Sequence, residues 1–137
     1  MKKTFTFSEI IAFDNYEIEA VTPGDVMVKT KVTASALNYH HTAHGGYLFA
    51  LSDQIAGLAS VSTGYDAVTQ QANIHYLRPG KLGDCLHIHG ICLHNGRTTK
   101  VVEVTITNQA QKTLSKASFT MFVTGKRQEE TGVTQQS

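Results

Sequence analysis

The stretch HGGYLFALSDQIAGLASVSTG, residues 44–64, carries the pattern that decides the fold. After two glycines, apolar side chains recur at spacings of three and four, which is typical of a helix with one face packed against a core. These side chains are Leu48, Leu51, Ile55, Leu58 and Ala59. Ser62 and Thr63 bring polar residues back, and Gly64 suits a helix C-terminus. The pattern predicts one helix over residues 46–62, and no other long helix is indicated.

Alternating apolar and polar residues predict strands before this helix. Tyr16, Ile18 and Ala20 alternate with two glutamates, which predicts a half-buried strand over residues 16–21. The segment Thr22-Pro23-Gly24-Asp25 favours a tight turn. A second alternating segment over residues 26–32 completes a hairpin, and a short helical turn is expected near residues 8–11.

Four more strands are predicted after the helix. They cover residues 68–77, 84–94, 98–107 and 114–124. Asn95-Gly96 is a preferred two-residue turn and predicts a hairpin between the second and third of them. Along the second, Leu86, Ile88, Gly90 and Cys92 would face one side of the sheet and the residues between them the other.

The order of elements predicts an α+β fold in which a single helix covers one face of an antiparallel sheet. The uncovered face then needs solvent-tolerant side chains or a second subunit, so we expect self-association. We expect one domain over residues 1–125 and a flexible polar tail over residues 126–137.

Composition narrows the class of function. The chain has 137 residues, enough for one domain, and 12 Lys plus Arg against 11 Asp plus Glu give a net charge of +1. That balance argues against a nucleic-acid partner, and no apolar run reaches the roughly 20 residues that span a bilayer. The N-terminus is too polar for a signal peptide, and Cys85 and Cys92 alone cannot hold a secreted scaffold together. We therefore expect a cytoplasmic protein that binds neither nucleic acid nor membrane.

Two features at the predicted helix suggest chemistry. Gly45 and Gly46 leave backbone N–H groups uncovered at the positive end of the helix dipole, where they suit an oxygen that gains negative charge. Asp53 lies among the apolar residues of the helix, where a carboxylate is costly without a partner and is often a base or a nucleophile. Plainer interpretations stay open: the glycines could permit close packing, and Asp53 could face solvent.

The same region carries a motif made of Asn38, His44, Gly45, Gly46, Asp53 and Gly57. This motif resembles that of the hotdog-fold acyl-CoA thioesterases, most closely the PaaI-like branch of phenylacetate degradation. The resemblance continues through residues 68–69, 73–79, 81–84 and 95–97 and covers about residues 16–124. It implies a hotdog fold, in which a six-stranded antiparallel sheet wraps one long central helix. It also implies hydrolysis of acyl-CoA thioesters to a carboxylic acid and CoA.

The resemblance further implies a role for each matching residue. Asp53 would be the general base or the nucleophile, and the Gly45 N–H would donate to the oxyanion. His44 would orient the thioester or hold the loop, and Asn38 would help to position the carbonyl or the attacking water. Thr69, from the facing protomer, would hydrogen-bond that water.

The resemblance also implies an assembly, a dimer of dimers with the active site shared across the dimer. No cofactor is expected, because CoA is part of the substrate. Gly46 is expected to contact substrate as well. This chain departs from the pattern at one position of the loop. Some relatives carry a glycine three residues after the asparagine, and this chain has His41 there.

Basic residues near turns could meet the phosphates of CoA or could be solvated surface. They are Arg78, Lys81, Arg97 and Lys100. Arg97 is the preferred candidate, because a hairpin tip can reach into a neighbour's cleft, and Arg78 is the second. Cys85, His87 and His89 share one strand face and could ligate zinc, but no fourth ligand is visible, so no metal is expected.

Two other functions stay open. A hotdog hydratase or dehydratase would act on the same thioesters, although such relatives typically have a proline-containing loop and this chain has no proline between Pro23 and Pro79. A non-catalytic acyl-CoA-binding protein would gain little from Asp53 beside a thioester.

Overall fold

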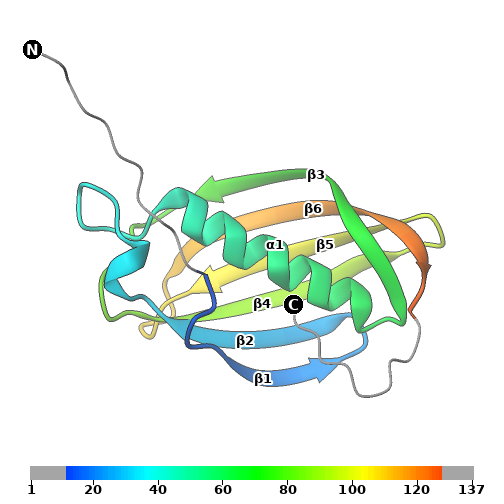
Figure 1. The fold of residues 1–137 in the computed structure, drawn as a ribbon, viewed down its shortest axis with the longest axis horizontal. Helices are drawn as coiled ribbons and strands as arrows, with labels where there is room; N and C mark the ends of the chain where they lie inside the picture. The colour runs from blue at the N-terminus through cyan, green and yellow to red at the C-terminus, as the bar shows by residue number, and fades with distance from the viewer. Residues whose placement is uncertain (1–11, 128–137) are drawn as a thin grey trace, which may run out of the picture.

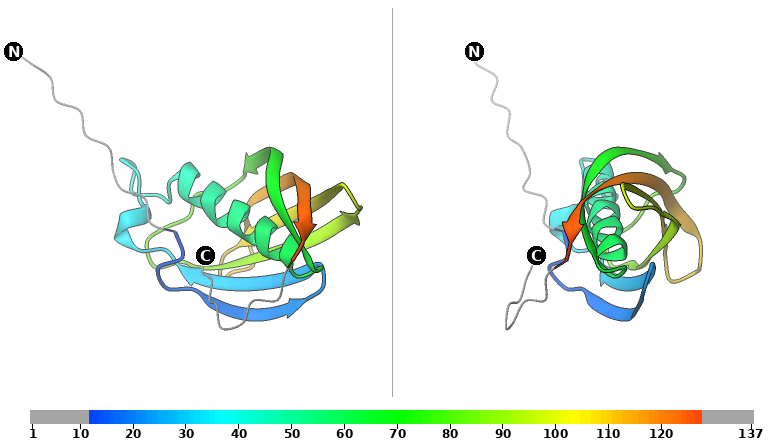
Figure 2. Two further views of the ribbon diagram at one scale, coloured as in Figure 1. Left: turned by 45° about the vertical axis from the view of Figure 1, so that its right-hand side comes forward. Right: turned by 90° about the vertical axis from the view of Figure 1, so that its right-hand side faces the viewer.

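A six-stranded antiparallel sheet curls around one long helix in the computed structural model, which describes residues 12–127 (Figures 1 and 2). The elements in chain order are β1 (Glu17–Thr22), β2 (Asp25–Lys31), a short 3-10 helix (Ala34–Ala36), α1 (Gly45–Val61), β3 (Tyr65–Tyr76), β4 (Cys85–Asn95), β5 (Thr99–Thr107) and β6 (Thr113–Lys126). The strands lie in the order β1-β2-β4-β5-β6-β3, so β1 and β3 form the two edges. The predicted α+β architecture, with one helix against a six-stranded sheet, is confirmed.

The core lies between α1 and the concave face of the sheet. The helix contributes buried apolar side chains at the predicted spacing, including Leu48, Leu51 and Ile55. Ser52 and Ser60 are buried on the same face, and their hydroxyls donate to the carbonyl oxygens one turn earlier in the helix, at 2.9 and 3.0 Å. These bonds satisfy the buried hydroxyls within the helix.

Gly90 sets how closely the helix approaches the sheet. A Cβ at this position of β4 would lie 2.7 Å from Ile55 Cγ2 and 3.5 Å from the Ile55 carbonyl oxygen. Because real Cβ atoms do not come that close, any other residue would push α1 away from β4. The contact therefore fixes the distance between β4 and the middle of α1, at a point two residues from Asp53.

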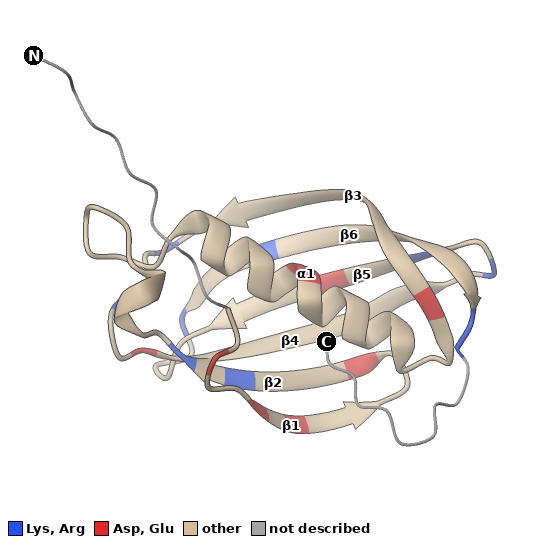
Figure 3. Ribbon diagram, viewed as in Figure 1, with Lys and Arg blue, Asp and Glu red and all other residues tan. Residues whose placement is uncertain are grey.

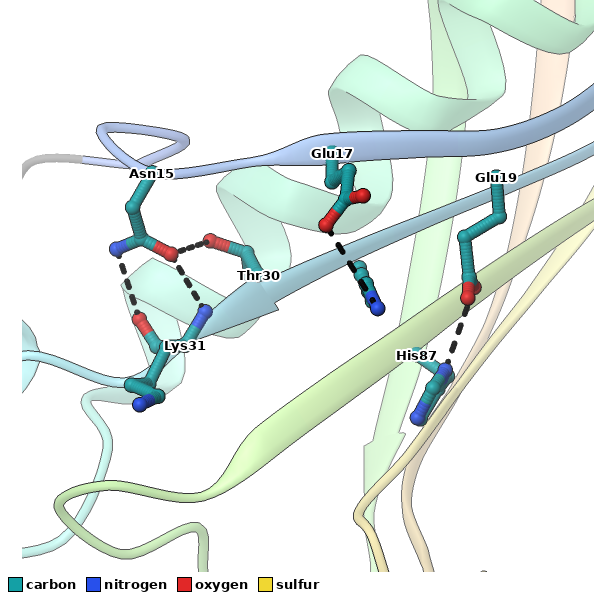
Figure 4. A network of polar contacts seen from close by, with 7 residues as sticks. Asn15, Glu17, Glu19, Thr30, Lys31 and His87 are labelled. Carbon is teal, nitrogen blue, oxygen red and sulfur yellow. Dashed lines mark hydrogen bonds and ion pairs between the residues drawn. The ribbon is translucent and has the colours of Figure 1, made fainter.

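Strand β1 differs from its prediction. All six of its residues are exposed, and Ile18 keeps 52% of its surface accessible, so the expected half-buried strand is wrong for the chain alone. Polar contacts attach it instead (Figure 4): Glu17 pairs with Lys29 at 3.6 Å, and Glu19 reaches across β2 to His87 at 3.3 Å. Just before the strand, Asn15 Oδ1 accepts hydrogen bonds from Lys31 N–H and from the hydroxyl of β2 residue 30. The alternation correctly predicts a strand here. Its apolar side is exposed because α1 of the same chain does not pack against this edge strand.

Several boundaries also differ. Gly64 adopts a φ of +98° and reverses the chain tightly, so β3 begins at Tyr65, three residues before the predicted start. The β4–β5 hairpin turns two residues later than predicted, because Gly96 N–H donates to Thr99 O at 3.0 Å and leaves residues 97–98 at the tip. The tail expected from residue 126 does not start there: Lys126 belongs to β6, and Arg127 donates to Gly64 O and to Asp66 Oδ1, each at 2.9 Å. Residues 128–137 and the turn expected at residues 8–11 lie outside the described residues.

The positions of charged residues are spread over the helix, the strands and the loops, and those of Lys and Arg gather in no single part of the described ribbon (Figure 3). Among residues 12–127, no helix has the length and apolar character needed to cross a membrane.

Candidate functional site

The loop before α1 is organised by the Asn38 side chain. Its Oδ1 accepts hydrogen bonds from His40 N–H at 2.9 Å, Thr42 N–H at 3.1 Å and the Thr42 hydroxyl at 3.2 Å. The carboxamide oxygen is therefore engaged inside the loop, which leaves the side-chain NH₂ as the group that could meet a ligand. His41 adopts a φ of 62°, the left-handed conformation that glycine takes easily. The loop thus has a shape that a glycine at this position would favour, and the departure at His41 does not alter it.

His44 is the N-cap of α1. Its Nδ1 accepts from Gly46 N–H at 3.2 Å, and its carbonyl oxygen accepts from the N–H groups of Tyr47 and Leu48 at 3.0 and 3.1 Å. Between these contacts, Gly45 N–H donates to no acceptor among residues 12–127. Of the two N–H groups expected to face substrate, that of Gly45 is available and that of Gly46 is occupied by the cap.

A cavity of about 330 Å³ opens beside Gly45. Its lining comes from the start of α1 and from the segment that follows β3: Ala43, Gly45, Leu48, Tyr76, Leu77, Arg78 and Pro79. The Tyr76 hydroxyl donates to the Gly45 carbonyl oxygen at 2.8 Å, and burial raises the pKa of this phenol above its usual value. Tyr76 therefore stays a neutral donor through the neutral pH range.

Asp53 projects from the middle of α1 toward β3. Its side chain is half-buried, and Thr69 Oγ1 donates to Asp53 Oδ1 at 2.7 Å. The other carboxylate oxygen accepts no hydrogen bond from residues 12–127 and can take a proton or attack a carbon. The interpretation of Asp53 as a wholly solvent-facing residue is wrong.

The contact with Thr69 joins α1 and β3 of one chain. The resemblance implied a threonine from the facing protomer, and in the structure, which describes a single chain, Thr69 contacts Asp53 of that chain. The tight turn at residues 62–64 explains this, because it folds β3 back along α1 and brings Thr69 beside a residue 16 positions earlier.

The site is split along the helix. Gly45 and Asp53 are eight residues apart in α1, and a rise of 1.5 Å per residue places them about 12 Å apart. A base and an oxyanion donor that act on one carbonyl must both lie within about 3 Å of the reacting atoms. We call Asn38, His44 and Gly45 the donor half and Asp53 with Thr69 the base half; in one chain the two halves lie about two helical turns apart.

The basic candidates are dispersed. Arg78 lines the cavity beside Gly45, and its guanidinium donates to the Thr113 carbonyl oxygen at 2.8 Å. Lys81 is exposed in the following turn. Arg97 is exposed at the β4–β5 hairpin, which lies at the other end of α1 from its N-terminus (Figure 1), so it could reach the donor half of another chain only.

Lys100 corrects the expectation that it meets phosphate or lies on solvated surface. It is 1% exposed, its Nζ donates to Asn95 Oδ1, and it lies 5.0 Å from the centroid of the Tyr65 ring. Lys100 is a structural residue of the hairpin, held by an amide and an aromatic face.

A metal site is not formed by the strand-face histidines. His87 and His89 contact Glu19 and Asp25 at 3.3 and 2.7 Å, and no three His, Cys, Asp or Glu side chains within residues 12–127 come together as ligands.

Sequence reasoning missed Tyr76. The segment that contains it contributed to the family resemblance, yet the tyrosine was given no role. Its position directly before Leu77-Arg78-Pro79-Gly80, at the end of a strand, is the signal that could have placed it beside another loop.

Comparisons with known proteins find relatives that match most of the chain. The family model described as the thioesterase superfamily matches residues 40–115. The "Acyl-coenzyme A thioesterase PaaI" of Escherichia coli (strain K12) is 39% identical over 99 residues, which cover 72% of this chain and 71% of that protein.

Solved structures resemble the whole domain. A hypothetical thioesterase protein from Streptococcus pneumoniae TIGR4, with coenzyme A, has a TM-score of 0.89 and 57% identity, and the match covers 90% of this chain and 100% of that one. The same thioesterase is also known as one variant with an aspartate changed to alanine and another with a threonine changed to alanine. A Streptococcus mutans UA159 protein bound to acetyl CoA has a TM-score of 0.83 and 56% identity, over 89% of this chain and 98% of that one.

Proposed function

This chain belongs to the thioesterase superfamily and has the hotdog fold, and from that membership we propose that it hydrolyses acyl-CoA thioesters to a free carboxylic acid and CoA. A relative from E. coli is named as an acyl-CoA thioesterase, and two streptococcal relatives hold coenzyme A or acetyl CoA. One observation carries the proposal. The chain has both an unpaired N–H at the start of α1 and a half-buried carboxylate held by a threonine.

We propose the following chemistry. The Asp53 carboxylate takes a proton from water as the water oxygen attacks the thioester carbonyl carbon, and the tetrahedral oxyanion accepts the Gly45 N–H at the positive end of the helix dipole. When the intermediate collapses, the C–S bond breaks and the CoA sulfur receives the proton. Alternatively, the Asp53 carboxylate attacks the carbonyl carbon directly, and CoA leaves as its thiolate when the C–S bond breaks. Water then hydrolyses the resulting anhydride, which releases the carboxylic acid and restores Asp53, and the CoA sulfur takes up a proton.

The role of Thr69 in this scheme is to orient Asp53. Its hydroxyl donates to one carboxylate oxygen and leaves the other free to face the water or the carbonyl. The aspartate and the threonine replaced by alanine in the S. pneumoniae thioesterase are 16 positions apart, the same separation as Asp53 and Thr69, which supports this pair as the working unit.

The split of the site along α1 supports a dimer as the smallest active unit. The donor half of one protomer would face the base half of its partner, which removes the separation of about 12 Å that a single chain imposes. Exposed edge strands and an uncovered sheet face support further pairing into a dimer of dimers. A light-scattering mass near 14.9 kDa at micromolar concentration would refute this assembly.

The supporting groups are part of the same proposal. Arg97 of a partner would meet the CoA phosphates, and Arg78 and the Asn38 amide would contact the substrate nearer the thioester. CoA enters as part of the substrate, so no cofactor is needed, and the cytoplasm, where acyl-CoA is supplied, is the proposed location.

Release of free thiol from a panel of acyl-CoAs tests this function against its alternatives. A thioesterase releases thiol, a hydratase or dehydratase changes the acyl chain without releasing it, and a binder does neither. Asp53→Asn should lower kcat by at least about 10²-fold, the usual scale for loss of an acid–base group. Asn keeps the size of the side chain, so the melting temperature should change little. An Asp53→Asn protein with near wild-type turnover would remove Asp53 from the mechanism.

A further inference from the structure

We propose that Tyr76 is a positioning residue for catalysis, which holds Gly45 so that its N–H points to the site of the oxyanion. The inference rests on the proposed function, because it assigns a purpose to a residue that touches the donor half. The juxtaposition comes from two distant segments: Tyr76 is the last residue of β3 and Gly45 the first residue of α1.

Tyr76 contacts Gly45 in two ways. Its hydroxyl donates to the Gly45 carbonyl oxygen at 2.8 Å. Its ring also lies against the Gly45 α-carbon, so a Cβ on residue 45 would be 3.3 Å from Tyr76 Cζ. The backbone of Gly45 is helical and would accept any residue, so the ring of Tyr76 is the feature that favours glycine here.

Each backbone polar group next to the Gly45 N–H has a hydrogen-bond partner. His44 N–H donates to Ala36 O at 2.7 Å, and the His44 carbonyl accepts two N–H groups of the first helical turn. In the peptide that joins Gly45 to Gly46, the N–H is bound by His44 Nδ1 and the carbonyl by Tyr76. The Gly45 N–H is the one group left open in this frame, and fixing its neighbours fixes its direction. Such preorganisation is what makes an oxyanion donor effective.

Tyr76 itself is anchored firmly enough for this task. It pairs with Ser115 in the ladder between β3 and β6, and the next residue, Leu77, donates to Leu114 O at 2.7 Å. The Arg78 guanidinium adds a bond to the Thr113 carbonyl oxygen. Tyr76 therefore transmits the position of the sheet to the start of the helix.

The first test separates positioning from binding. Tyr76→Phe keeps the ring and removes the hydrogen bond, and Tyr16→Phe is the control, because Tyr16 is an exposed phenol outside the site. Since the oxyanion forms only after the substrate has bound, we expect Tyr76→Phe to lower kcat roughly tenfold with KM nearly unchanged, and Tyr16→Phe to change neither. A rise in KM at constant kcat would mean that Tyr76 contacts the substrate and does not position Gly45, which would overturn the proposal. Wild-type kinetics in Tyr76→Phe would overturn it as well.

The second test does not depend on activity. Leu at position 76 lacks the ring atoms that face Gly45, so Gly45→Ala should lower the melting temperature by a few degrees in the wild-type background and by less in Tyr76→Leu. Equal losses in the two backgrounds would show that the ring does not constrain residue 45, which contradicts the proposal. If the wild type releases no thiol from any acyl-CoA, the proposed function fails, and this coupling still reports whether Tyr76 holds Gly45.

Discussion

Replacing Gly45 by proline should remove the oxyanion donor and almost nothing else. Gly45 is the first residue of α1, the position at which proline is best tolerated in a helix. His44 has φ −63° and ψ 139°, an extended conformation of the kind required before proline. The lost N–H donates to no acceptor among residues 12–127, so folding loses no hydrogen bond with it.

Gly45→Ala is the matched control for this substitution. Both variants place a Cβ 3.3 Å from Tyr76 Cζ, so that packing cost is shared. Proline differs from alanine in lacking the N–H and in carrying its ring Cδ in the place of that hydrogen. Loss of one oxyanion-hole donor costs about 10²–10³ in kcat, or about 2.7–4 kcal/mol, and we expect that factor between the alanine and proline variants.

The assay is thiol release at saturating acyl-CoA, with thermal melts by circular dichroism to show that both variants fold. The comparison rests on kcat, because the donor acts on charge that develops after binding. KM is not diagnostic here, because the proline Cδ also faces the carbonyl of the bound substrate. Equal kcat values for folded Gly45→Pro and Gly45→Ala would refute the assignment of this N–H as the oxyanion donor.

Three further predictions concern phosphate binding, packing and thiol reactivity. Arg97→Ala should raise KM for acyl-CoA roughly ten- to a hundred-fold with kcat intact, and should leave an acyl-pantetheine without the nucleotide unaffected; an equal loss on both substrates would mean that Arg97 shapes the site instead. Gly90→Ala should lower the free energy of unfolding, measured by urea titration, by about 1–3 kcal/mol because its Cβ would meet Ile55. The control Gly57→Ala places its Cβ in open space and should be neutral or stabilising, and a neutral Gly90→Ala would contradict the close approach of α1 to β4. Burial raises the pKa of the Cys92 thiol, so its thiolate fraction at about pH 8 is smaller than that of an unperturbed cysteine, and iodoacetamide should label it more slowly than a small model thiol; faster labelling would contradict the buried position.

The helix and the six strand segments could be predicted because each rests on periodicity within one segment. The spacing of Leu48, Leu51 and Ile55 predicted α1 to within a residue at each end. The burial of β1 could not be predicted, because alternation identifies an apolar side but says nothing of what covers it. Ile18 has the right pattern and lies at an edge that the chain's own helix does not reach.

The candidate site was predicted as a set of residue types and not as a geometry. The motif identified Gly45 and Asp53, but their separation along α1 follows only once both are known to lie on one straight helix. Thr69 lies within the first half of β3 and Tyr76 is its last residue, and their contacts depend on how the turn after α1 directs that strand. Such long-range contacts are set by packing, for which a single sequence has no local signal.

Complementation between two inactive variants is the most direct test of the central claim that the donor half and the base half come from different chains. Asp53→Asn and Gly45→Pro, carried on chains with different affinity tags, are co-expressed and the mixed assemblies are purified through both tags. In a symmetric dimer with shared sites, each mixed dimer has one site with intact Asp53 and Gly45, so the dual-tagged protein should regain turnover, up to about half that of wild type, although each parent variant is nearly inactive. Mixed dimers as inactive as their parents would contradict the shared site.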